Sequence, residues 1–473
     1  MSYKLIITSL FSILFFSCSS PSKEVKQVSA DTVSTAAASV SAPLIEKGKV
    51  VNPVVCVGNA TQSYAAYLPS YYNSTKKYPI LFAFDAHAGG RIPVEAYKDL
   101  CEKYGYIIVA SNNSKNGLDA ATLSDITGTF MNDVKQRISI NENRIYLTGF
   151  SGGARVASSI AMNDGAAGLA CCSAGFQPGT ALSFCYIGFA GSEDFNSNEM
   201  IQLDEALNST PTPHQLILYD GKHDWPTAEV FEDAFVWFEM NAMKKKVITR
   251  NDALINAFEQ KQNSKIKMLQ SKSKSYEGYM ETKKTVRFLD GLKDCSSFKL
   301  QITTLEKTSA VQKTILEKNN IEKREAELQN YYREALQSKD LNWWNKEVDN
   351  LQAQLTSKQN SHEEFLMYKR TLSFLSLLAY MASNSALNGG QMPQAAMYLQ
   401  LYQKVDPTNA EVYYLQASLL MRQQNYLDAM TQLNLAADNG FTDIERLEKD
   451  PAMAIALQSP QYPDLVKKMQ SKK

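Results

Sequence analysis

Ser151 lies in the stretch YLTGFSGGARVASS (Tyr146–Ser159), where an apolar run meets two glycines and a small-residue helical pattern follows. In a G-x-S-x-G turn between a strand and a helix, the serine is held in a strained, exposed position, and the glycines avoid clashes that Cβ atoms would cause. Such a turn also directs N–H groups at the helix start toward a developing oxyanion. The pentapeptide alone does not separate a nucleophile from a plain glycine-rich turn, so a base, an acid and an oxyanion site are needed elsewhere.

The base that a serine hydroxyl needs is sought among four histidines, His87, His214, His223 and His362. His362 lies in a charged helical region, and His214 precedes an apolar run, at the wrong end of an expected strand. His223 follows the run QLILYD, inside DGKHDWP. We therefore expect His223 at the carboxyl end of the last strand and assign it as the base, the alternative being a surface loop histidine.

A carboxylate must orient the base and stabilise its imidazolium form. The apolar run FCYIGFAG is followed by GSEDFNS, which places Asp194 at the carboxyl end of another expected strand, with Glu193 as an adjacent substitute. Asp220 and Asp224 are too close to His223 in sequence to reach behind its ring. Asp194 is therefore the candidate acid.

The oxyanion site should combine the N–H of Gly152 with an N–H from a loop after an earlier strand. The segment LFAFDAHAGGR supplies such a loop, because Gly89 and Gly90 permit close backbone approach. The second donor is expected to be the N–H of His87 or Ala88. The His87 imidazole is expected to shape the loop rather than to act as the base.

Alternating strand-like and helix-like segments between residues 47 and 246 must position these loops. The helical stretches are RIPVEAYKDLCEKY, DAATLSDITGTFMNDVKQRI, GGARVASSIAMND and DAFVWFEMNAMKK, and the strand-like runs are YPILFAFDA, YGYIIVASNN, RIYLTGF, GLACCSAG, FCYIGFAG and HQLILYDG. Nearly continuous apolar runs are typical of strands buried on both faces. The alternation predicts an α/β domain with a mainly parallel sheet covered by helices.

Four motifs in residues 50–240 together resemble one group of enzymes. YLPSYYNSTKKYPILFAFDAHAGG, GFSGGARVA, GSEDFN and DGKHDWP are similar to segments of the α/β-hydrolases related to polyhydroxybutyrate depolymerases and feruloyl or acetylxylan esterases. The resemblance implies an α/β-hydrolase sheet domain with a triad in the chain order Ser151, Asp194, His223, the acid standing in a G-x-x-D motif. The sequence departs from the group at AHAGG, which replaces HGxGG, and at GKH, which replaces GGH.

Residues 247–370 carry a different pattern. They are rich in Lys, Gln, Glu and Asn, nearly lack glycine and proline, and place apolar residues at helical intervals. This pattern predicts long helices with polar outer faces. Coiled-coil packing is an alternative, although the heptads are not sustained.

Residues 371–473 contain an internal repeat with an offset of 34, in which Ala395 aligns with Ala429. Over roughly residues 373–440 the pattern resembles the tetratricopeptide repeat, in which small residues let paired helices approach closely. The resemblance implies a groove that docks a peptide or another protein subunit. A generic array of helical hairpins is the alternative, and FTDIERLEKDPAMAIALQSPQYPDL is expected to act as a cap.

The N-terminus predicts export and lipid anchoring. Lys4 is followed by LIITSLFSILFFS, which is too short to span a bilayer and is typical of a secretory signal. Ser17–Cys18 resembles a bacterial lipoprotein cleavage site, so residues 1–18 are assigned as signal peptide with Cys18 as the lipidated residue. The Ser/Ala-rich residues 19–46 are expected to form a flexible tether to the cell envelope. A plain signal peptide cut nearby is the alternative.

Composition narrows the partners and cofactors. The 49 basic and 49 acidic residues balance, whereas a nucleic-acid-binding protein normally carries a basic surplus. The seven cysteines show no CxxC spacing, which argues against zinc, and Cys171, Cys172 and Cys185 are expected to be small buried hydrophobes. We expect no metal or organic cofactor.

These observations together predict a lipid-anchored serine esterase that works through an acyl-enzyme, with the membrane and a protein or peptide as further partners. By resemblance, an acylated polysaccharide is a natural substrate class. A serine peptidase of the same fold is one alternative. The other is a scaffold lipoprotein whose helical repeats bind partners while the hydrolase domain is inactive.

Overall fold

The computed structural model describes residues 45–179, 181–357 and 359–472. The predicted signal peptide, the expected lipidation site Cys18 and nearly all of the predicted tether lie outside these residues. Within them, no helix is both long enough and apolar enough to cross a membrane. The described residues belong to one compact unit.

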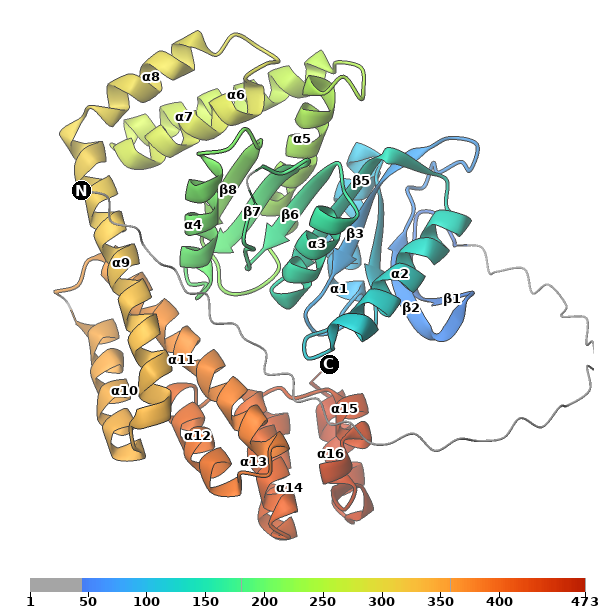
Figure 1. The fold of residues 1–473 in the computed structure, drawn as a ribbon, viewed down its shortest axis with the longest axis vertical. Coiled ribbons are helices and arrows are strands. Elements are labelled where there is room, and N and C mark those ends of the chain that lie inside the picture. The colour runs from blue at the N-terminus through green and yellow to red at the C-terminus, as the bar shows by residue number, and fades with distance from the viewer. Residues whose placement is uncertain (1–44, 180, 358, 473) are drawn as a thin grey trace, which may run out of the picture. The chain divides into compact units, whose positions relative to one another are not determined.

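An eight-stranded sheet forms the centre of the N-terminal half, in the order β1-β2-β4-β3-β5-β6-β7-β8 (Figure 1). The strands from β3 to β8 are parallel, whereas β1 and β2 pair antiparallel at one edge. Their bounds are β1 Val50–Cys56, β2 Asn59–Tyr67, β3 Tyr78–Phe84, β4 Ile107–Ser111, β5 Ile140–Phe150, β6 Gly168–Cys172, β7 Cys185–Gly191 and β8 His214–Tyr219. All six predicted strands are present, and β1 and β2 are additional.

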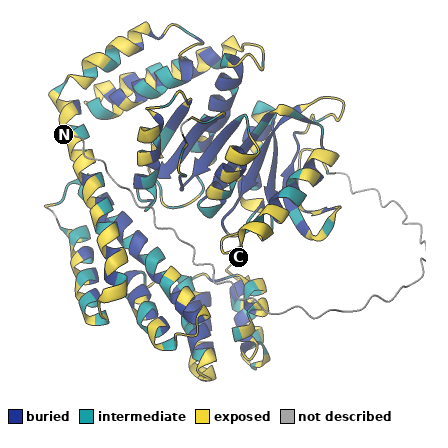
Figure 2. Cartoon of the chain, viewed as in Figure 1, coloured by how far each residue is buried: buried dark blue, intermediate teal, exposed yellow. Residues whose placement is uncertain are grey.

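Five helices cover the two faces of this sheet. Their bounds are α1 Arg91–Tyr104, α2 Ala120–Arg137, α3 Gly152–Asn163, α4 Ser197–Leu207 and α5 Ala228–Lys244. Alternate residues of β3 point to opposite faces, so that Leu81 belongs to the same buried cluster as residues of α1 and α5, and Phe82 to the cluster that includes residues of α2, α3 and α4. Figure 2 shows the strands as mainly buried, as expected for apolar runs covered on both sides.

Long helices follow the sheet domain, as the polar helical pattern predicts. They are α6 Asp252–Ser271, α7 Ser275–Leu289, α8 Ser296–Glu306, α9 Ser309–Ser338, α10 Leu341–Thr356 and α11 His362–Asn388. The first of them extend the core of the sheet domain, because Phe288 of α7 stacks on Phe258 of α6 at 4.7 Å and lies 4.8 Å from Trp237 of α5. Much of the surface of α9 is exposed (Figure 2).

The C-terminal residues fold into further short helices: α12 Met392–Val405, α13 Ala410–Arg422, α14 Tyr426–Asp438, α15 Ile444–Lys449 and α16 Tyr462–Gln470. The starts of α12 and α14 differ by the 34-residue offset of the sequence repeat, and Ala395 and Ala429 are both fully buried at equivalent positions. The fold class is therefore confirmed as an α/β sheet domain followed by an all-helical region.

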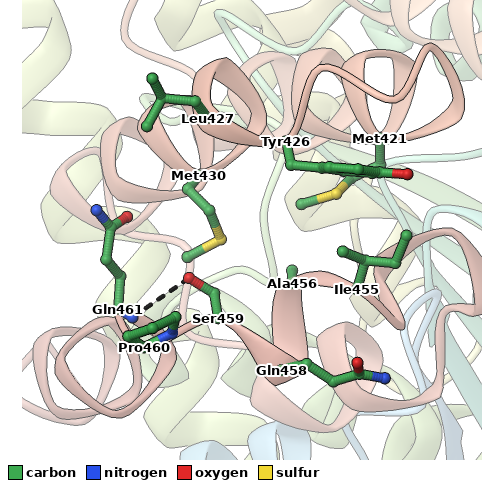
Figure 3. Close-up of a pocket in the computed structure, with 10 residues that line it drawn as sticks. All are labelled: Met421, Tyr426, Leu427, Met430, Ile455, Ala456, Gln458, Ser459, Pro460 and Gln461. Atoms are coloured by element: carbon green, nitrogen blue, oxygen red, sulfur yellow. Dashed lines mark hydrogen bonds between the residues drawn. The ribbon is translucent and has the colours of Figure 1, made fainter.

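A cavity of about 420 Å³ lies among these last helices (Figure 3). Met421, Tyr426, Met430 and Ile455 line it, and every other lining residue also comes from residues 421–461. The cavity therefore belongs to the C-terminal helices and not to the neighbourhood of Ser151.

Candidate active site

Ser151 occupies the turn between β5 and α3. β5 ends at Phe150 and α3 begins at Gly152, so one residue makes the whole connection. The backbone of Ser151 has φ 52° and ψ −120°, a conformation that residues with a side chain rarely adopt. Its N–H donates to the carbonyl of Cys172 on β6 at 2.9 Å. Strain of this kind, held by neighbouring structure, is typical of functional sites.

Of the glycines around Ser151, Gly149 and Gly153 face backbone atoms at close range, and Gly152 faces a side chain. A Cβ on Gly149 would lie 2.2 Å from the carbonyl oxygen of Gly153, and a Cβ on Gly153 would lie 2.0 Å from the carbonyl oxygen of Phe84. A Cβ on Gly152 would lie 1.7 Å from the Asn116 side-chain oxygen. The turn therefore has the tight geometry expected of a nucleophile elbow.

The structure brings Ser151, His223 and Asp194 into one hydrogen-bonded line. Nε2 of His223 is 3.0 Å from Oγ of Ser151, and Nδ1 of His223 is 2.8 Å from Oδ1 of Asp194. The three residues follow β5, β8 and β7, so they meet at the carboxyl edge of the sheet. The Asp194 side chain is fully buried, while 21% of the His223 side chain is exposed. The imidazole is therefore partly exposed, beside a shielded carboxylate.

Aromatic rings and a backbone amide fix the imidazole and the acid. Phe195 stacks on the His223 ring at 4.1 Å between centroids, and Phe150 lies 4.9 Å away. Oδ1 of Asp194 also accepts a hydrogen bond from the N–H of Asn196 at 2.8 Å. One carboxylate oxygen thus serves both the imidazole and the loop backbone, which orients the Nδ1 edge of His223 toward it.

His214 and His362 lie away from Ser151. His214 begins β8, where Nδ1 contacts the carbonyl of Thr212 at 2.8 Å, and burial lowers its pKa. His362 is the first residue of α11 and stacks on Phe365. Each of these histidines is accounted for by local contacts away from Ser151.

The alternative acids are also engaged elsewhere. Glu193 accepts a hydrogen bond from Lys369 at 2.7 Å. Asp224 accepts from the N–H of Trp225, and Asp220 is 3.4 Å from the hydroxyl of Ser192. The acid that reaches His223 is Asp194.

A buried carboxylate organises the expected oxyanion loop. Oδ1 of Asp85 accepts from the N–H groups of His87 at 2.8 Å and Gly89 at 3.1 Å. Of the two expected loop donors, the N–H of His87 is therefore already bonded. Ala88 lies between His87 and Gly89 in the sequence and has φ 62°. This geometry favours the N–H of Ala88 as the partner of the Gly152 N–H.

Asp85 and Trp225 are candidate site residues that the sequence patterns did not single out. Nε1 of Trp225 donates to Oδ2 of Asp85 at 2.8 Å, so the segment that carries His223 is tied to the oxyanion loop. Two signals were available: an acidic residue ending an otherwise apolar run, and the tryptophan of DGKHDWP. Neither signal identifies its partner, because the two residues are 140 positions apart.

The cysteines behave as buried thiols. Cys56, Cys101, Cys171, Cys172, Cys185 and Cys295 are all free and buried. Burial raises the pKa of Cys171, as expected of a thiol among apolar strands. In the part of the chain that the structure describes, no group of three or more His, Cys, Asp or Glu side chains could hold a metal ion.

Sequence comparison finds no matching family model and no matching curated protein. Among solved structures, the chain is similar to an S-formylglutathione hydrolase from Staphylococcus aureus, at 15% identity over 37% of this chain and 92% of that one, with a TM-score of 0.32. It is also similar to a mutant feruloyl esterase module from Clostridium thermocellum complexed with sinapinate, at 17% identity over 40% of this chain and 86% of that one, with a TM-score of 0.33. These are partial likenesses at low identity, so the function proposed below rests on the geometry of the site.

Proposed function

We propose that this protein is a serine hydrolase that cleaves a carboxylic ester through an acyl-enzyme. The observation that carries the proposal is the hydrogen-bonded line from Ser151 through His223 to Asp194 on a strained strand-to-helix turn. A serine hydroxyl is a weak nucleophile until an adjacent base takes its proton, and this line supplies the base and the group that orients it.

The first half-reaction forms a bond between Oγ of Ser151 and the acyl carbon of the ester. The hydroxyl proton passes to Nε2 of His223, and the carbonyl electron pair moves to the oxygen, which becomes an oxyanion. The N–H groups of Gly152 and Ala88 are the donors proposed to stabilise it. Collapse of the intermediate breaks the ester C–O bond, and His223 returns the proton to the leaving alkoxide.

The second half-reaction repeats these steps with water as the nucleophile. His223 takes a proton from the water, whose oxygen attacks the acyl carbon. Collapse of the second oxyanion breaks the bond between the acyl carbon and Oγ of Ser151, which takes the proton back from His223, and the carboxylic acid is released. Throughout, Asp194 stabilises the imidazolium that forms on His223 and holds its tautomer. No step of this cycle requires a cofactor.

An acylated polysaccharide is the substrate class that we propose, because the four motifs of the sheet domain resemble those of enzymes acting on such esters. A panel of acetylated and feruloylated glycans, with simple peptides as the competing class, tests this choice. Turnover of the peptides alone would replace the esterase by a serine peptidase of the same fold.

We also propose that the protein is anchored in the cell envelope through a lipid on Cys18. The support is the signal-like apolar run and the Ser17–Cys18 junction. The mass of the mature protein should show diacylglycerol on Cys18, and a bare N-terminus at another residue would contradict the anchor.

A docking role for the C-terminal helices is a further proposal. Its support is the 34-residue repeat, with Ala395 and Ala429 buried at equivalent places of α12 and α14. Crosslinking in the native envelope should attach a protein to residues 371–473, and the absence of any such product would contradict this role.

The catalytic proposal is tested by Ser151→Ala, with the exposed Ser159→Ala of α3 as the matched control. Hydrolysis of p-nitrophenyl butyrate by Ser151→Ala should fall by about 10³-fold or more, because triad members act as a unit. Ser159→Ala should retain wild-type turnover. Unchanged turnover in Ser151→Ala would remove Ser151 from the mechanism.

A further inference from the structure

The loop that carries Asp194 is contacted from outside the sheet domain. This acid loop, Ser192–Asn196, connects β7 to α4. The guanidinium of Arg370 donates to the carbonyl of Ser192 at 2.9 Å, and Nζ of Lys369 donates to Oε1 of Glu193 at 2.7 Å. Both donors belong to α11, which begins far along the chain from the sheet.

Helix α9 contacts the same loop and the start of α4. Nε2 of Gln329 donates to the carbonyl of Phe195 at 3.3 Å, and Nδ2 of Asn198 donates to the carbonyl of Glu322 at 2.9 Å. The contacts from α9 and α11 thus fall on both sides of Asp194. Two of them are made to backbone carbonyls of the loop, which fixes the path of its main chain.

A buried ion pair holds Arg370 in place for its contact with Ser192. Nε of Arg370 donates to both carboxylate oxygens of Glu325 at 3.0 and 2.9 Å, and Nη2 donates to Oε2 at 2.5 Å. The Arg370 side chain is 9% exposed and that of Glu325 is fully buried. Burial raises the pKa of Glu325, and the hydrogen bonds from Arg370 oppose this effect. The pair joins α9 to α11 and leaves Nη1 of Arg370 directed at the loop.

The acid loop also reaches the imidazole through Phe195, whose ring stacks on His223. A shift of this loop would therefore move Asp194 and one wall of the His223 site together. Catalytic geometry is sensitive to such shifts, since a displacement of about 1 Å can cost about 10²-fold in rate.

We propose that α9 and α11 hold the acid loop in its catalytic register, with Lys369 and Arg370 as positioning residues for the reaction. The inference rests on the proposed function, because the loop that the two helices hold carries Asp194 of the proposed triad. The helical region is then part of the catalytic unit and not only a docking platform.

A matched pair of lysine variants tests the contact to Glu193. Lys369→Met removes a pair whose lysine side chain is 34% exposed, and Lys404→Met removes the Lys404–Asp349 pair between α12 and α10, whose lysine is 35% exposed. Both changes should alter the unfolding temperature little and equally, because partly exposed pairs contribute little to stability. We expect kcat to fall about 5-fold in Lys369→Met with KM nearly unchanged, and Lys369→Arg to restore most of it. Lys404→Met should retain the wild-type kcat.

The double variant Arg370→Met with Glu325→Leu tests the buried pair without leaving a charge unpaired. Replacement of a buried ion pair by apolar side chains is often neutral or stabilising, so the unfolding temperature should be unchanged or higher. The contact to the Ser192 carbonyl is lost, so kcat should fall by about 10- to 100-fold. Loss of activity without loss of stability is an outcome that a purely structural pair would not produce.

Hydrogen–deuterium exchange distinguishes a failure of this inference from a failure of the proposed function. Peptides that span Gly191–Asn198 should exchange faster in Lys369→Met and in the double variant, but not in Lys404→Met. Unchanged exchange and unchanged kcat in both test variants would overturn the positioning role even if the wild type is an active hydrolase. Faster exchange in these two variants, in a protein whose wild type proves inactive, would support the structural hold on the loop while refuting the hydrolase.

Discussion

The loop that carries His223 and the loop that carries Asp194 are held in place by different sets of contacts. The segment that carries His223 is tied to the oxyanion loop within the sheet domain, through the hydrogen bond between Trp225 and Asp85. The acid loop also bonds within that domain, where the N–H groups of Ser192 and Glu193 donate to the carbonyls of Tyr219 and Gly221. It is contacted in addition from outside the domain, by residues of α9 and α11 such as Gln329 and Arg370. One half of the site is therefore self-contained within the sheet domain, whereas the other adds contacts to helices that follow much later in the chain. Changes at each support should separate these two dependences.

Among substitutions at the supports of the site, the largest effect is expected for Asp85→Ala. It leaves the N–H groups of His87 and Gly89 and the indole of Trp225 without their shared acceptor. We expect kcat for p-nitrophenyl butyrate to fall by about 10²-fold, because the oxyanion loop and the His223 segment both lose hydrogen bonds that hold them in position.

Asp133→Ala is the matched control for this change. Asp133 is also buried, accepts from the N–H of Val57 and the hydroxyl of Tyr64, and pairs with Arg137 near the antiparallel edge of the sheet. It should lower the free energy of unfolding by about 3 kcal/mol while kcat per folded molecule is retained. Equal losses of kcat in the two variants would mean that Asp85 has no special relation to the site.

A smaller effect is expected for Trp225→Phe. The phenyl ring keeps the packing against Phe150 and Tyr97, whose centroids lie 5.8 and 6.0 Å away, but the N–H donor to Asp85 is lost. Turnover should fall by about 3- to 10-fold with a stability loss of about 1 kcal/mol. Wild-type kinetics in this variant would show that the indole acts by packing alone, and the self-contained half of the site would need another support.

The smallest effect concerns the helix that supports the acid loop, and it depends on pH. Burial raises the pKa of Glu322 on α9 to about 7, and the charge of Glu205 acts in the same direction. The other charged groups that influence this carboxyl are Lys318, Arg370 and Glu325. The pKa of Glu322 is higher in the folded protein than in the unfolded chain. The stability that the protonated carboxyl contributes at low pH is therefore lost as the pH rises through 7.

Glu322→Gln removes this loss. Since the side chain is only partly buried, we expect the variant to be more stable than wild type by about 1–2 kcal/mol at pH 8 and by less at pH 5. Urea titrations at the two pH values measure the difference. A variant that is stabilised equally at both would contradict a titrating carboxyl at this position.

The sequence predicted candidate triad residues in both halves of the site, but not the contacts that hold them. Six strands and the helices α1, α2, α3 and α5 were predicted, because buried parallel strands are continuous apolar runs and the intervening helices keep their spacing. β1 and β2 were missed because Asn59–Tyr67 has no continuous apolar run and Val50–Cys56 contains a proline and exposed positions. Ser151, Asp194 and His223 were singled out because each follows an expected strand, and the structure places the three strand ends at the same edge.

The supports of the site could not be predicted in the same way. Arg370 contacts a carbonyl 178 positions earlier, and backbone carbonyls carry no residue type that a pattern could show. The Glu325–Arg370 pair spans 45 positions between two helices whose surfaces are rich in charge, so nothing in the sequence separates this pair from its exposed neighbours. Burial alone makes it distinct, and burial follows from the packing of α9 against α11.

The central claim, a nucleophilic Ser151 activated by His223 and Asp194, is tested most directly by covalent labelling. The purified protein is treated with a fluorophosphonate probe, digested, and analysed by mass spectrometry, with Asp194→Asn and His223→Ala treated in parallel. We predict one adduct, on the peptide that contains Ser151, and labelling slower by about 10³-fold or more in both variants. An unlabelled wild-type chain, or an adduct on any other residue, would contradict the account.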